Sequence, residues 1–102
     1  MGDGGDLFKI IGLAALGIAA LVGVIFVTKI TLDKIRNKAK KVPGAETAEL
    51  IKETLASGNY RVVTNIFGSK KELLDTQTWE GKELDYKLEA EFGRKNKIEI
   101  KL

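Results

Sequence analysis

The side chains best suited to acid–base chemistry are four carboxylates close together in the last third of the chain: Glu83, Asp85, Glu89 and Glu91. Paired carboxylates can act as general acid and general base when a fold holds them in one cleft. These four instead alternate with apolar residues from residue 83 to residue 92, a pattern typical of an amphipathic strand. We therefore predict that they lie on a solvent-facing side and provide solubility.

The chain has neither histidine nor cysteine. Histidine is the commonest general base and metal ligand, so a Ser–His or Cys–His nucleophile system and the usual zinc ligand sets are excluded. No glycine-rich phosphate loop follows a predicted strand, because Gly2, Gly4 and Gly5 lie in the first six residues and the other glycines stand singly. The sequence predicts a protein that is not an enzyme, with no cofactor and no metal site.

An uncharged and almost wholly apolar run covers nineteen residues from Ile10 to Thr28. As a helix it would be about 28 Å long, close to the roughly 30 Å of bilayer hydrocarbon. We predict one transmembrane helix that continues as a basic juxtamembrane helix, so that the unit spans residues 7–41. A cleaved signal peptide fits less well, since Asp3 and Asp6 precede a core that is too long, and a buried core helix would need more chain to cover it.

Basic residues are concentrated after this run. Residues 1–41 carry seven basic and three acidic side chains, and residues 42–102 carry ten basic and eleven acidic ones. Basic flanks stay on the cytoplasmic side, which predicts an N-terminus outside or in a lumen and a C-terminal domain in the cytoplasm, the stroma or the matrix. The basic residues after the run either only set this topology or also contact anionic lipid headgroups. They are Lys29, Lys34, Arg36, Lys38, Lys40 and Lys41. Because the charge is juxtamembrane, we expect no nucleic-acid partner.

Small residues recur along one side of the predicted span, at Gly12, Ala15, Ala19 and Gly23. Such a strip lets another transmembrane helix approach closely. The expected partners are therefore lipids together with a transmembrane protein or a second copy of the chain. The alternative is that the strip faces only lipid, since Ala and Gly are common in membrane helices.

The remaining chain predicts a small α+β domain over residues 45–102, after a mobile tail at residues 1–6 and a hinge at residues 42–44. Residues 45–57 have the spacing of an amphipathic helix. Residues 60–67 are rich in β-branched and aromatic side chains, and residues 83–92 and 97–102 alternate, which favours a C-terminal hairpin. Residues 69–82 predict a helical turn or bulge before a short strand. The expected fold is one helix on an antiparallel meander of about four strands, with the second sheet face charged.

Two aromatic residues stand out in this domain. Trp79 precedes a predicted turn at Gly81 and is either a core residue or an exposed contact for a partner. Tyr86 lies on the apolar side of the predicted strand and is expected in the core.

These features are those that a non-catalytic accessory subunit or assembly factor of a larger membrane complex would need. Small single-span subunits of this kind occur in bioenergetic and photosynthetic membranes, an analogy from architecture alone. The alternative hypothesis is a self-associating membrane scaffold or a protein that binds anionic lipid surfaces. Loss of a heterologous complex on replacing Ala15 and Ala19 with Leu would favour the first hypothesis.

Overall fold

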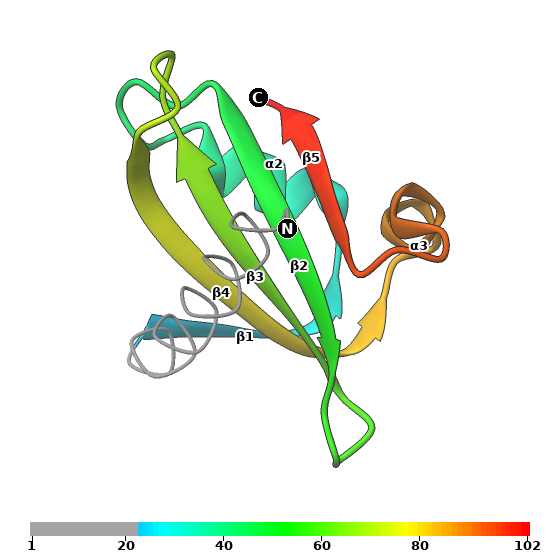
Figure 1. Ribbon diagram of the computed structural model, residues 1–102. Helices are drawn as coiled ribbons and strands as arrows, with labels where there is room; N and C mark the ends of the chain where they lie inside the picture. Colours follow the sequence, from blue (N-terminus) through cyan, green and yellow to red (C-terminus); the bar gives the residue numbers. More distant parts are fainter. Residues whose placement is uncertain (1–22) are drawn as a thin grey trace.

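A mixed five-stranded sheet organises residues 23–102, the part of the chain that the computed structural model describes (Figure 1). In chain order its elements are β1 (Val24–Ile30), α2 (Leu32–Ala39), β2 (Thr47–Thr54), β3 (Tyr60–Phe67), β4 (Leu73–Leu84), α3 (Tyr86–Phe92) and β5 (Lys97–Lys101). The strand order is β1-β4-β3-β2-β5, with β1 parallel to β4 and the other neighbours antiparallel. The prediction of a small α+β domain with a helix on a sheet is confirmed, but the sheet has five strands and one parallel pair and is not a four-stranded antiparallel meander.

The first strand replaces the end of the predicted membrane helix. Residues 7–22 of that prediction, with Gly12, Ala15 and Ala19, lie outside the described residues. Val24–Ile30 form β1 and pair with Thr78–Leu84, so the prediction of helix through these positions is wrong. A run of Val, Ile and Phe suits a strand as well as a membrane helix, and composition does not separate them. Within residues 23–102, neither helix has the length and apolar character needed to cross a membrane.

The helix expected in the basic segment is present as α2, but it does not continue from a helix, because the end of the apolar run before it is the strand β1. The Thr31 hydroxyl caps it by accepting a hydrogen bond from the Lys34 N–H at 3.1 Å. It ends before a turn at Val42–Ala45, in which Pro43 and a Gly44 with φ of +83° occupy the central positions. That combination is typical of a type II turn. The core nevertheless begins before this turn, at Ile30, Ile35 and Ala39.

Residues 45–57 do not form the predicted helix. Thr47–Thr54 are β2, which pairs with β3 on one side and with β5 on the other. Ala48 and Leu50 point into the core from this strand. The segment contains good helix formers, but propensity is a weak preference that two ladders of strand hydrogen bonds override.

The prediction of a strand over residues 60–67 is confirmed by β3. Its partner β4 is longer than expected and extends through the predicted turn at Gly81. The tight connection at Gly68–Glu72 includes Lys71 at a φ of +63°, and the register shifts at Ile66/Phe67. Ile66 pairs with Asp75 and Phe67 with Leu73, so the bulged residue is Leu74 of β4, within the predicted segment of residues 69–82.

The predicted C-terminal hairpin is wrong. β4 ends at Leu84, residues 86–92 are helix α3, and β5 pairs with β2. Leu84, Leu88 and Phe92 are buried and four residues apart, which is the spacing of one helix face. The same residues also alternate with period two, so the sequence fits a strand as well as a helix. Only the contacts that these residues make in the folded domain decide between the two.

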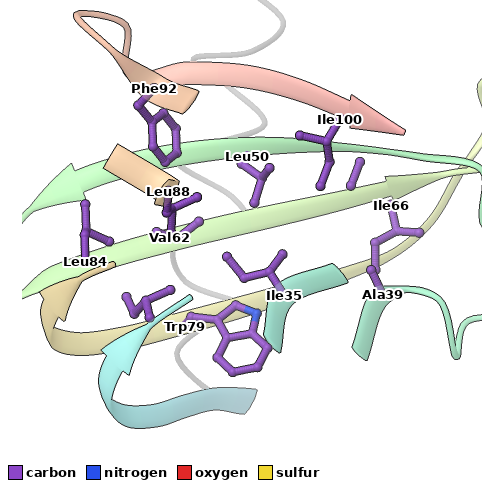
Figure 2. Packing of buried hydrophobic residues seen from close by; sticks show 12 residues of the cluster. Ile35, Ala39, Leu50, Val62, Ile66, Trp79, Leu84, Leu88, Phe92 and Ile100 are labelled. Atoms are coloured by element: carbon purple, nitrogen blue, oxygen red, sulfur yellow. The ribbon is translucent and has the colours of Figure 1, made fainter. Parts of the chain in front are cut away.

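The core lies between one face of the sheet and the two helices (Figure 2). Ile35 and Ala39 of α2 and Leu88 and Phe92 of α3 enter it from the helix side. The sheet supplies side chains that alternate along each strand, among them Leu50, Val62, Ile66, Trp79 and Ile100. Lys52 lies at the margin, with its ammonium 5.2 Å from the centre of the Phe92 ring.

Candidate functional site

The helix α2 and the turn after it present basic side chains to solvent. Ile35 and Ala39 are fully buried, whereas Lys34 and Lys38 on α2 and Lys41 in the following turn are exposed. We call these three lysines the α2 basic face. Arg36 and Lys38 also lie in the last turn of the helix, where positive charge complements the helix dipole. The core contact of α2 thus orients its lysines outward.

The other basic residues expected at lipid headgroups are arranged less uniformly. Lys40 is exposed at the C-cap of α2, and Arg36 is half-buried. Lys29 lies on β1 beside Glu83 of β4, and its carbonyl oxygen is 3.4 Å from the ammonium of Lys34. The structure therefore concentrates positive charge on α2 and the end of β1.

A hollow of about 260 Å³ lies where β1 and β4 lead into their helices. It is lined by Thr31, Leu32, Asp33, Asp85, Tyr86 and Lys87. The Asp85 N–H donates to the carbonyl oxygen of Ile30 at 2.9 Å, which holds the starts of the two helices together. The N-cap side chains Thr31 and Asp85 already accept backbone N–H groups there. The hollow therefore has polar walls, and the two helices that begin there are capped by side chains of this chain.

Tyr86 lies at the rim of this hollow with 74% of its surface exposed. Its prediction as a core residue is wrong, because it occupies the first position of α3 on the side away from Leu88. An exposed tyrosine beside a hollow is a common anchor in protein interfaces. An N-cap Asp at position 85, followed by Leu88 and Phe92 at helical spacing, is the sequence signal that would have found it.

Trp79 has 4% of its surface exposed and belongs to the core cluster. Of the two interpretations of this residue, the structure shows the core one. Gly23, the described member of the predicted small-residue strip, is exposed just before β1.

The second face of the sheet carries paired charges. Arg61 of β3 lies opposite Glu53 of β2 and Glu80 of β4, with N–O distances of 3.5 and 3.4 Å. Glu49 and Glu99 are direct cross-strand neighbours, a repulsive pair that Lys97 offsets at 3.6 Å from Glu49. Asn65 links Glu49 to Thr76 through its side-chain amide.

The four carboxylates singled out by their sequence spacing are divided among different elements. Glu83 lies at the end of β4, Asp85 caps α3, and Glu89 and Glu91 lie on α3. Within residues 23–102, no three Asp or Glu side chains are grouped so that they could hold a metal ion.

The structure thus brings together a basic helix face and, near the N-terminal end of the same helix, a hollow with an exposed tyrosine. Comparison of the chain with models of protein families, with curated proteins and with solved structures found no match.

Proposed function

We propose that this chain is a non-catalytic, single-pass membrane protein that serves as an accessory subunit or assembly factor of a larger membrane complex. In this proposal the uncharged apolar run that begins at Ile10 anchors the chain, and the α+β domain lies against the membrane surface. The α2 basic face carries the proposal, because it follows the apolar segment closely in the chain and points away from the core. Lysines near an anionic leaflet contribute about 1 kcal/mol each.

The test of this orientation measures lysine reactivity in vesicles that contain the full chain. Acetylation of each lysine is followed by mass spectrometry in vesicles of phosphatidylcholine alone and in vesicles that also contain phosphatidylglycerol. We expect Lys34, Lys38 and Lys41 to react several-fold more slowly in the anionic vesicles. High salt should remove the difference, since it screens surface charge.

The matched controls are Lys95 and Lys101, which are also exposed and lie at the β5 side of the sheet. Their rates should be the same in both kinds of vesicle. Equal rates for all five lysines would show that the α2 basic face does not contact anionic lipid.

The accessory role is tested by purifying the tagged full-length protein from its native membranes in mild detergent. A stoichiometric heterologous partner supports the role, and a Tyr86→Ala variant should lose part of that partner if Tyr86 contacts it. Glu91→Ala, at an exposed position of the same helix that does not line the hollow, is the control. Recovery of the protein with lipid alone would favour the self-associating scaffold instead.

A further inference from the structure

Val24–Thr28 belong to two arrangements that exclude each other. In the sequence these residues are the last part of the uncharged run that begins at Ile10. In the structure they are most of β1 and pair with β4 from Thr78 onward. A residue that lies in a strand of the domain is not at the same time part of a helix inside the bilayer.

Length decides which residues an anchor needs. With β1 formed, the uncharged run that remains is residues 10–23, which cover about 21 Å as a helix. The hydrocarbon core of a bilayer is about 30 Å thick. Adding residues 24–28 brings the helix to about 28 Å, so the full span requires the residues that the sheet also uses.

β1 can leave the sheet by breaking a single ladder of strand hydrogen bonds. It is an edge strand that is bonded to β4 on one side and has no other strand partner within residues 23–102. Phe26 is 72% exposed there, although lipid would cover it in a membrane. Beyond these residues the chain is fixed in the core by Ile30, which is fully buried and whose carbonyl oxygen accepts the Asp85 N–H.

We propose that Val24–Thr28 exchange between the sheet and the membrane, pairing with β4 before insertion and completing the transmembrane helix after it. This inference rests on the proposed membrane anchor. The hinge is Lys29, between the exchanging residues and the fully buried Ile30. Because Ile25 and Val27 lie opposite Trp79 and Gly81, insertion uncovers Trp79 and leaves β4 as the edge of the sheet.

The test uses disulfide formation between neighbouring strands, since the natural chain has no cysteine. Val24→Cys with Thr78→Cys places two thiols at paired positions of β1 and β4. Adjacent strands are about 4.8 Å apart, within the range of a disulfide. Ile51→Cys with Val63→Cys, a pair between β2 and β3, is the matched control.

Each full-length variant is synthesised with and without phosphatidylcholine–phosphatidylglycerol vesicles, and membrane-inserted protein is defined by resistance to alkaline carbonate extraction. A membrane-permeant oxidant is added to parallel samples that have not been extracted with carbonate. We expect the β1–β4 disulfide to form readily without vesicles and at least five-fold less in inserted protein, while the β2–β3 disulfide forms in both. Acrylamide quenching of Trp79 should rise several-fold in inserted natural protein.

Three other results would overturn the proposal, and they differ from one another. Equal β1–β4 cross-linking in inserted protein would leave the anchor intact and exclude the exchange. Failure of that pair without vesicles, while the β2–β3 pair forms, would show that β1 does not dock on β4. Complete extraction by carbonate would exclude both the membrane anchor and the exchange.

Discussion

Ile25 of β1 lies directly opposite Trp79 of β4, in the parallel pair that joins the N-terminal strand to the antiparallel part of the sheet. Ile25 packs at the edge of the cluster that contains Trp79, whose side chain is almost fully buried. Because Trp79 is the single tryptophan of the chain, its fluorescence reports the presence of β1 without interference.

Replacing Ile25 with alanine should destabilise the domain by about 1–2 kcal/mol, less than a fully buried site because Ile25 is partly exposed. The emission of Trp79 should shift to longer wavelength in the folded variant. Urea unfolding followed by Trp79 fluorescence measures both effects. Thr28→Ala, at an exposed position of β1, should leave the emission unchanged.

Gly81→Ala should displace β1 from β4. A Cβ at Gly81 would lie 2.8 Å from the carbonyl oxygen of Val27 and 3.0 Å from the Ile30 side chain. Overpacking of this kind costs about 1–3 kcal/mol. Hydrogen exchange should speed up at the β1 amides while β2 and β3 stay protected.

The control for this variant is Gly23→Ala, because a Cβ at Gly23 meets no atom within 4 Å. Unchanged exchange at β1 in Gly81→Ala would mean that β1 does not approach β4 as closely as the structure places it.

Leu88→Ala and Tyr86→Ala separate the helix at residues 86–92 from the strand that the alternating pattern suggested. Leu88 is fully buried, so its truncation should cost about 2–5 kcal/mol. Tyr86 is largely exposed, and its truncation should change stability by no more than about 0.5 kcal/mol. Denaturant unfolding measures both values. Comparable losses in the two variants would place both side chains on one buried face and contradict α3.

Asp85→Ala should weaken the start of α3. The Asp85 carboxylate accepts a hydrogen bond from the Lys87 N–H at 3.2 Å and caps the helix. Loss of an N-cap costs about 0.5–2 kcal/mol, whereas Asp85→Asn keeps an acceptor and should remain close to the natural protein. Thermal unfolding of the three proteins tests this order. An Asn variant as unstable as the Ala variant would assign the effect to charge instead of capping.

The local sequence was sufficient to predict an element where its residues fit only one kind of secondary structure. Tyr60–Phe67 combines β-branched and aromatic side chains, and the strand β3 is there. Pro43 and Gly44 form the predicted turn after the helix of the basic segment, because proline disfavours helix before it and glycine accepts a positive φ. The alternation of residues 97–101 also predicted a strand, which is present as β5, whereas the alternation of residues 83–92 predicted a strand where most of the residues form α3.

The sequence by itself determined the small α+β class, the β3 strand, the helix within the basic segment, the turn after it and the absence of histidine and cysteine chemistry. Tertiary structure decided the remaining elements, since their local patterns fit two structures. Residues 47–54 are a strand because β3 and β5 bond to both edges, and residues 86–92 are a helix because Leu88 and Phe92 then reach the core. Val24–Ile30 are a strand because β4 supplies a parallel partner. Burial against specific neighbours outweighs differences in propensity that are below about 1 kcal/mol per residue.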